Sequence, residues 1–363
     1  MTPATVVIAP DSFKGTATAI EVTDALAEGW ASVRPEDLMV RMPLADGGEG
    51  TLDAFEIAVP GAERVPVTAQ GPDNRPVAAS WIRLPDNSAV VELAETSGIM
   101  LLDPLQPLDA HTIGFGQAIA AALDAGVTRL YLAIGGSSST DGGAGALGAL
   151  GARLLDAEGA PVAAGGRGLS DLASVDLSAL RPLPDGGAIV LSDVTSPLLG
   201  ASGAAAVFGP QKGATPDDVA TLDAGLARLA ALLSADPSTP GAGAAGGAGF
   251  GMLAWGATIA AGADAVGEVL HTADAVASAS IVITGEGRFD GQSDAGKVPS
   301  YVRALAASGT AQPMLVAGAI SADPVGFGAA VSLTDLAGSA EAAMSDTLHW
   351  LREAGARLAA TVR

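Results

Sequence analysis

Cysteine is absent from this chain of 363 residues, and histidine and aromatic residues are scarce. Without cysteine, disulfide bonds, thiolate metal sites and cysteine nucleophiles are excluded. The three histidines, His111, His271 and His349, lie far apart without metal-ligand spacing, so we interpret them as structural residues. The length predicts about two domains, and a hydrophobic content of 49% is ample for two cores.

Positive charge is also scarce. Lysine and arginine total 18 residues against 40 aspartates and glutamates, so the formal net charge is −22 at pH 7. Such an acidic protein is unsuited to nucleic acids and to anionic membrane surfaces. No apolar run reaches the roughly 18 residues of a membrane span, and the longest candidate, Phe250–Ala263, is broken by glycines. Thr5–Ala9 has no basic flank and is too short for a signal sequence. We expect a soluble cytoplasmic protein, and its oligomeric state stays open.

Lysine occurs at only three positions, and each lysine adjoins a glycine: Lys14, Lys212 and Lys297. The other fifteen of the 18 basic residues are arginine. Lysine is a compact point charge, whereas arginine is a broad planar fork, and a neighbouring glycine lets the backbone approach a ligand closely. We predict phosphate or carboxylate contacts for Lys14 and Lys297. Codon bias that left three surface lysines is the alternative, and for Lys212 the two interpretations stay balanced.

Short apolar runs alternate with helical patterns along the chain, which predicts a parallel sheet buried on both faces. The expected strands are Val6–Ala9, Leu38–Pro43, Leu130–Ile134, Ala188–Leu191, Ile281–Thr284, Met314–Ala317 and Ala330–Leu333. Thr18 and Glu21 form a capping-box pattern at the start of the first helix. Val65–Glu92 reads instead as several short strands separated by turns and starts an inserted domain. The low-complexity segment 241–247 predicts a flexible loop.

Polar residues gather where five of the expected strands end. In open α/β sheets, ligands bind outside the carboxyl ends of the strands, so five such loops predict one assembled site. The loops are Pro10–Gly15, Ala45–Gly50, Gly135–Gly143, Ser192–Pro197 and Gly285–Asp290.

Each loop has a chemical interpretation and a structural alternative. Gly135–Thr140 offers N–H groups and hydroxyls to an anion at a helix N-terminus, or is a capped turn. Asp46 and Glu49 suit Mg²⁺ or substrate hydroxyls, or are acidic residues that favour a helix start. Asp193 follows a buried strand and can accept a proton from a hydroxyl, or it is a turn residue. Asp290 is its rival as the base.

Two nucleotide-binding fingerprints are incomplete. Gly143–Gly148 matches G-x-G-x-x-G but is separated from its strand, and Gly241–Gly246 matches within low complexity, so neither indicates a dinucleotide site. Gly291–Val298 fits a phosphate-binding loop except that Val298 replaces the Ser or Thr that binds magnesium. The partial match supports a contact between Lys297 and a phosphate.

Several unusual motifs together resemble the bacterial glycerate kinase family, in the order of that family and over nearly the whole chain. They are Ala9–Gly15, Pro43–Gly50, Gly135–Gly143, Asp193–Gly200, Phe208–Gly213 and Gly285–Arg288 with Gly296–Pro299. The sequence departs from the family at Thr140 and Ser196, where asparagine is usual, and at Ser293 and Asp294. These departures concern the shape of the substrate pocket.

The resemblance implies an α/β fold of two α/β domains, a Rossmann-like parallel-sheet domain with a second mixed-sheet domain inserted into it. Residues 1–64 and 272–363 would form the first domain and 65–271 the second, with 111–140 assignable to either. It also implies phosphorylation of D-glycerate by ATP with Mg²⁺, giving 2-phosphoglycerate. Attack by O3 is the alternative. A dinucleotide-dependent oxidoreductase of a hydroxy acid and a non-enzymatic sensor of small acids are the other classes considered.

We assign site residues from the motifs and this resemblance. The catalytic candidates are Asp193, Lys14, Lys297 and Asp290, and the substrate-binding candidates are Asp46, Glu49, Arg288, Ser137 and Ser138. The cofactor-binding candidates are Gly135, Gly136, Lys212, Gly285 and Glu286, and the metal-binding candidates are Asp46 and Asp290. Because aromatic residues make up only 4% of the chain, aliphatic walls and backbone groups are expected to hold adenine.

Overall fold

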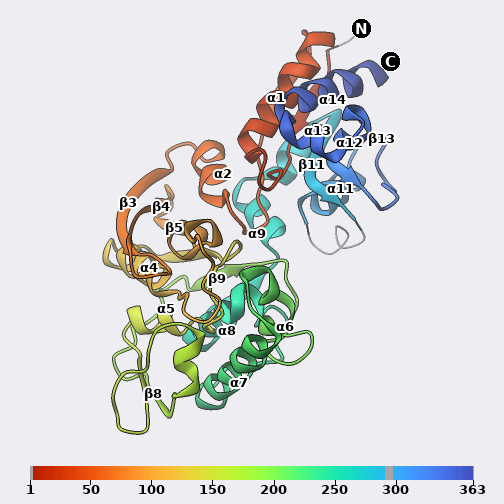
Figure 1. Ribbon diagram of the computed structural model, residues 1–363. Helices are drawn as coiled ribbons and strands as arrows, with labels where there is room; N and C mark the ends of the chain where they lie inside the picture. The colour runs from red at the N-terminus through yellow and green to blue at the C-terminus, as the bar shows by residue number, and fades with distance from the viewer. Residues whose placement is uncertain (1–2, 291–296, 363) are drawn as a thin grey trace. The chain divides into compact units, whose positions relative to one another are not determined.

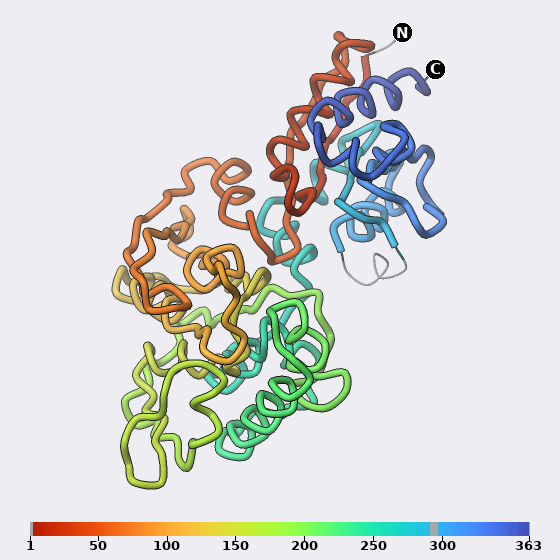
Figure 2. Tube along the Cα trace, viewed as in Figure 1, coloured from red at the N-terminus to blue at the C-terminus, as the bar shows by residue number. Residues whose placement is uncertain are grey.

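The computed structural model describes residues 3–290 and 297–362, which form two compact units (Figures 1 and 2). The first unit comprises residues 1–46, 53–60 and 261–363, and the second comprises 47–52 and 61–260. The second unit therefore contains residues 111–140. The domain boundaries expected at residues 64 and 272 stay a prediction, because compactness alone does not show which segments fold independently.

The first unit is built on five parallel strands in the order β13-β12-β11-β1-β2. Their bounds are β1 Thr5–Ile8, β2 Leu38–Arg41, β11 Ile281–Phe289, β12 Gln312–Ile320 and β13 Ala329–Ser332. Each coincides with or contains most of an apolar run expected to be a strand. The buried β1 pairs with β11 and β2, so the chain's beginning and its last third share one sheet.

The helices of the first unit are α1 Ala19–Val33, most of α2 Thr51–Ala58, α9 Gly262–Val269, α10 Thr272–Ala277, α11 Val298–Ala307, α12 Leu333–Ala337, α13 Ala340–Ser345 and α14 Thr347–Thr361. Of these, α1, α11, α12, α13 and α14 pack against the sheet. The capping box expected before α1 is confirmed, because Glu21 N donates to Thr18 Oγ1 and Thr18 N donates to Glu21 Oε2. Helices α1 and α14 lie side by side (Figure 1). A side chain at Gly29 would overlap the Arg352 carbonyl, so the two backbones meet directly.

The second unit contains a six-stranded mixed sheet in the order β10-β9-β6-β5-β4-β3. The strands are β3 Glu63–Gln70, β4 Pro76–Arg83, β5 Ser88–Glu92, β6 Arg129–Ala133, β9 Ala188–Leu191 and β10 Thr258–Ala260, and β7 Arg153–Leu155 and β8 Ser174–Asp176 form a separate ribbon. The antiparallel β3, β4 and β5 confirm the β-rich region predicted over residues 65–92. A parallel sheet and a mixed sheet together confirm the predicted α/β fold class.

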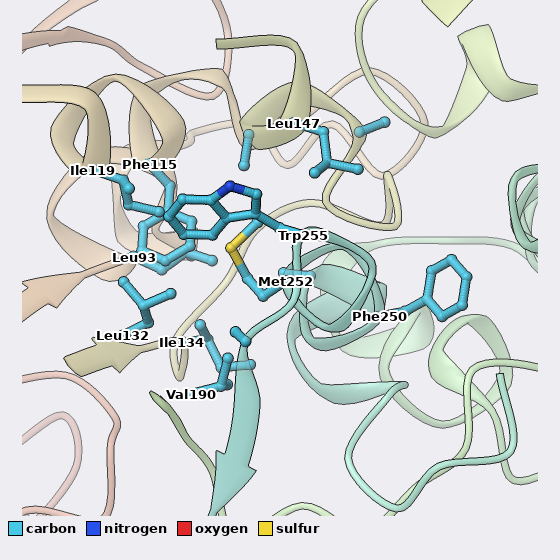
Figure 3. Close-up of a cluster of buried hydrophobic side chains, with 14 of the residues drawn as sticks. Leu93, Phe115, Ile119, Leu132, Ile134, Leu147, Val190, Phe250, Met252 and Trp255 are labelled. Carbon is cyan, nitrogen blue, oxygen red and sulfur yellow. The ribbon is translucent and has the colours of Figure 1, made fainter. Parts of the chain in front are cut away.

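Helices and a dense apolar core complete the second unit. The helices are α3 Ala94–Ser97, α4 Ile113–Asp124, α5 Ala144–Ala149, α6 Ala204–Phe208, α7 Pro216–Leu232 and α8 Ala244–Trp255, with short 3-10 helices η1 Ile99–Leu101, η2 Gly166–Ser170 and η3 Pro210–Lys212. Figure 3 shows Phe115 of α4 and Trp255 of α8 close to Leu93, which directly follows β5. Among all helices of the described chain, none is long and apolar enough to cross a membrane.

Two loop predictions are wrong. Gly285–Phe289 continues strand β11, because its residues pair in register with Val316–Ile320 of β12. The segment 241–247, expected to be a flexible loop, is largely buried and leads into α8 with left-handed backbone at Ala245, Gly246 and Gly247. Low complexity here reflects close packing, since small residues let this segment lie against the backbone of residues 139–142.

We expect Gly246→Ala to destabilise the protein severely. Its φ of 66° is left-handed, and a Cβ there would overlap the Ser139 carbonyl oxygen. Strain and overpacking together predict a loss of at least about 2 kcal/mol of unfolding free energy. Urea denaturation would measure it, with Gly148→Ala as the control because a Cβ at Gly148 meets nothing within 4 Å. Equal stability of the two variants would contradict the packing described for this segment.

Candidate active site

A cavity of about 360 Å³ opens in the first unit at the carboxyl ends of β1, β11 and β12. From β1 the sheet continues to β2 on one side and to β11, β12 and β13 on the other. The strand order therefore reverses its direction at β1, and open α/β sheets bind ligands at such a point, outside the carboxyl ends of the strands. One end of the cavity is charged and is formed by Lys14, Arg288, Lys297, Asp11, Asp46 and Glu286. We call this the charged end.

Lys14 reaches the charged end from the turn that follows β1. This turn closes through hydrogen bonds between Phe13 and Ala17, and Gly15 takes a left-handed φ of 81°. Lys14 Nζ lies 3.3 Å from Asp46 Oδ2, and the Asp46 carboxylate raises the pKa of Lys14. The side chain is 64% exposed, so its ammonium group is accessible to a ligand as well as to Asp46.

Arg288 and Lys297 bring two further cations to the same cavity. Arg288 lies on β11, exposed, with its Nε 3.9 Å from Asp290 Oδ2. Lys297 is the N-cap residue of α11, and its Nζ lies 3.2 Å from Oε2 of the buried Glu286. The cations therefore come from two distant parts of the chain, Lys14 from the beginning and Arg288 and Lys297 from the last third, and all three line one cavity.

Asp11 is a charged-end residue that the sequence assignment missed. Its side chain is buried, and burial together with the neighbouring Asp46 carboxylate raises the pKa of Asp11 well above its ordinary value. A buried acid between other carboxylates is typical of functional sites. The sequence feature that could have identified Asp11 as a site residue was its position in Pro10–Gly15, one of the five loops that follow the expected strands.

The charged end has a donor set that fits Mg²⁺ bound together with a phosphate. Mg²⁺ uses one or two carboxylates plus waters and phosphate oxygens rather than an all-protein cage. Asp11 and Asp46 are close enough for mutual repulsion, which a divalent cation would relieve. In the described part of the chain, no three Asp, Glu or His side chains gather as a self-sufficient metal site. Asp290, the second expected ligand, pairs with Arg288 instead of lining this cavity.

A second cluster of expected site residues lies in the second unit, after β6. Gly135 N donates to Gly47 O, and a Cβ at Gly135 would lie 2.5 Å from Gly48 Cα, so the two glycine segments touch. Ser138 is buried and donates through both its N–H and its hydroxyl to Ser97 O. Hydrogen bonds and close backbone contact therefore anchor this part of the chain, and we call residues 135–139 the serine segment.

Lys212 supports the serine segment from η3. It is only 2% exposed, and its Nζ donates to Ser137 Oγ at 2.8 Å and to Ser139 O at 2.5 Å. Burial lowers the pKa of Lys212 to about 7, although the nearby Asp141 carboxylate opposes this shift. The structure thus separates Lys212 from Lys14 and Lys297, because its amine is engaged inside the protein.

The remaining expected residues take varied positions. Glu49 is exposed just before α2, and Asp193 follows β9 with one carboxylate oxygen buried. Gly285 lies within β11, where a Cβ would overlap the Val316 carbonyl oxygen, and it accepts a hydrogen bond from Asp11 N. Residues 291–296 of the expected phosphate-binding loop lie outside the described residues. The first unit thus gathers Lys14, Arg288 and Lys297 with Asp11, Asp46 and Glu286, and the second unit contains Glu49, Asp193, the serine segment and Lys212.

Comparisons with known proteins agree with the motif resemblance. The model of the glycerate kinase family matches residues 6–363. The chain is 43% identical to "Glycerate kinase" of Bacillus subtilis (strain 168) and 40% identical to "Glycerate 2-kinase" of Escherichia coli (strain K12), each over 88% of this chain and 86% of the relative. A crystal structure described as glycerate kinase 2 from Salmonella typhimurium LT2 has a TM-score of 0.84 and 40% identity, covering 99% of this chain and 98% of that one.

Lys212→Met tests the buried amine through the pH dependence of stability. The folded-state pKa of Lys212, about 7, lies below the ordinary 10.5, so the unfolded chain holds a proton that the folded protein has lost. The unfolding free energy therefore rises with pH in this window, by about 2 kcal/mol between pH 7 and pH 9. Lys212→Met should lack this contribution, as urea denaturation at the two pH values would measure.

Lys14→Met is the matched control, because the Lys14 pKa is shifted upward and contributes no such rise between these pH values. A difference between Lys212→Met and the unaltered protein that is the same at both pH values would contradict a lowered pKa for Lys212.

Proposed function

Because the chain belongs to the glycerate kinase family, we propose that it transfers the γ-phosphoryl group of ATP to O2 of D-glycerate. Phosphorylation of glycerate is the activity of its relatives by name, and the name of the Escherichia coli relative supports O2 over O3. The observation that carries the proposal is the charged end, where Lys14, Arg288 and Lys297 meet in one cavity. Cytoplasmic location and action on free small molecules are part of the same proposal.

The three cations suit a reaction in which the protein mainly positions groups and neutralises charge. Lys14 and Lys297 would contact phosphate oxygens, since an ammonium group is a compact donor that follows the charge as it moves. Arg288 would clamp the glycerate carboxylate, because its planar guanidinium can form two parallel hydrogen bonds. Mg²⁺, when bound by Asp46 and Asp11 with phosphate oxygens, supplies further neutralisation of the developing charge.

The ion pairs of the charged end would change partners when substrates bind. Lys14 is 64% exposed, so breaking its pair with Asp46 costs little stability. An incoming phosphate can therefore take the Lys14 ammonium group from Asp46, whereas the Glu286 side chain is only 8% exposed and needs a compensating cation if Lys297 turns to a phosphate. The released Asp46 carboxylate would then orient a metal ion or substrate hydroxyls.

Asp193 is the proposed general base, and Asp290 is its rival. A base must accept the proton of the attacking hydroxyl, and Asp193 stands at the carboxyl end of β9, as ligand-binding residues do in such sheets. Asp290 is engaged with Arg288, which favours a role in holding that guanidinium. Glu49 and the Ser137 and Ser138 hydroxyls are proposed to bind glycerate, and Gly135 and Gly136 to approach the nucleotide.

Incubation with D-glycerate, ATP and Mg²⁺ should give ADP and 2-phosphoglycerate, which phosphorus NMR distinguishes from the 3-phosphate. Lys14→Ala and Lys297→Ala should each lower kcat/KM about 10²-fold or more, because each removes a donor to the transferring phosphoryl group. Thermal unfolding should be nearly unchanged in both variants.

Arg352→Ala is the matched control, since Arg352 is an exposed cation of the first unit that pairs with Glu28 away from the cavity. It should retain full activity. Well-folded protein that forms no phosphoglycerate would refute the proposed reaction, and formation of the 3-phosphate would move the attack to O3.

Asp193→Asn should lower kcat by about 10²–10⁴ while ATP still binds, because the amide cannot accept the hydroxyl proton. Single-turnover kinetics together with calorimetric titration of ATP and Mg²⁺ would separate the two effects. Asp290→Asn serves as the comparison. Near-normal turnover of Asp193→Asn with a large loss in Asp290→Asn would transfer the role of base to Asp290.

A further inference from the structure

The cavity of the first unit has a second end whose chemistry differs from that of the charged end. It is lined by Leu333, Ala340, Ala343 and Met344, with Thr334 and Thr347 as its polar members. Of the described residues at this end, none carries a charge. We call it the apolar end. A cavity of about 360 Å³ lies within the range of about 300–1,000 Å³ that holds drug-sized ligands, so a three-carbon acid would leave much of it unfilled.

One helical face forms most of the apolar end. Ala340, Ala343 and Met344 of α13 follow the spacing of i, i+3 and i+4, and Thr347 begins α14 after non-helical backbone at Asp346. Residues at this spacing share one side of a helix. Gly318 and Ala319 of β12 also line the cavity, so small residues from both the helix and the strand border it.

Met344 is the residue that points to an occupant. The residue is 64% exposed although it borders a cavity whose other large apolar residues, Phe13 and Leu333, are 2% and 1% exposed. A bound ring would cover this side chain and remove apolar surface from water. Methionine is also well suited to aromatic partners, because its sulfur is polarizable and its side chain adapts in shape.

The polar groups of the apolar end are arranged as hydrogen-bond acceptors. The Thr334 hydroxyl donates its proton to Gly318 O at 2.8 Å, and the Thr347 hydroxyl donates to Ala343 O at 3.0 Å. With their protons used in this way, both oxygens keep lone pairs for a donor. The exocyclic amino group of adenine is such a donor on an otherwise flat and uncharged ring.

We propose that the apolar end, between β12 and helices α12, α13 and α14, binds the adenine base of ATP while the charged end holds its phosphates. This inference rests on the proposed function and adds to it the location of the base. The same cavity would then hold both parts of the nucleotide, with the base at the apolar end and the phosphates beside the three cations of the charged end.

Ala340→Leu and Met344→Ala test the location of the base. Leucine at position 340 would occupy space needed by the ring, and both positions are exposed, so the fold should tolerate the changes. We expect the KM for ATP to rise about tenfold in Ala340→Leu and by a smaller factor in Met344→Ala. The KM for D-glycerate should stay within about twofold. Ser345→Leu is the matched control, because Ser345 is exposed on the same helix but does not line the cavity.

Inorganic tripolyphosphate separates this inference from the proposed function, since it has the phosphates of ATP without a base. It should compete with ATP in the unaltered protein, and Ala340→Leu should leave its inhibition constant unchanged. An unchanged KM for ATP, or an equal weakening of ATP and tripolyphosphate, would overturn the location of the base alone. Failure of tripolyphosphate to compete with ATP would count against the charged end as the phosphate site, and with it against this inference.

Discussion

The parallel pairing of β1 with β11 is the contact on which the candidate site depends. Val6 lies opposite Ile281 in this pairing. The hydrogen bonds continue beyond the apolar residues of β1, because Ala9 N donates to Ile283 O and Asp11 N donates to Gly285 O. The Thr284 hydroxyl also donates to Ala9 O. Residues about 275 positions apart are thereby fixed within one hydrogen-bond network. A one-residue slip would reverse which side chains face the cavity, because side chains alternate along a strand.

The charge of the site is balanced rather than simply positive. Three cations face three carboxylates in a protein whose net charge is −22, and two of the cations already have acidic partners at 3.2 and 3.3 Å. Both pairs hold an ammonium group at the cavity, and the pair at the exposed Lys14 contributes little to stability. Burial of Asp11 adds an acid that can hold a proton or neutralise a cation.

The three lysines show where composition and structure diverge. Their glycine neighbours predict ligand contacts for Lys14 and Lys297 and leave Lys212 undecided, and in the structure Lys14 is exposed, Lys297 is partly exposed and Lys212 is buried. Lys212 secures the serine segment by donating to Ser137 and Ser139. A contact between Lys212 and the nucleotide stays a prediction, and its burial means that the amine influences any ligand chiefly through the residues that it holds. The scarcity of lysine in the sequence thus does not distinguish an exposed lysine at a cavity from a buried lysine that holds other residues in place.

Local patterns determined much of this protein from the sequence alone. Apolar runs predicted all five strands of the first unit, Thr18 and Glu21 predicted the start of α1, and the motifs indicated the family, because each depends on neighbouring residues. The short strands β7, β8 and β10 were not predicted. The extension of β11 through Phe289 and the burial of residues 241–247 could not be predicted, since both depend on partners distant in the chain. Only the tertiary structure placed Asp11 among the cations and Met344 beside them in one cavity. The physical reason is that strand order and register, which no local pattern encodes, decide which strand ends share a cavity.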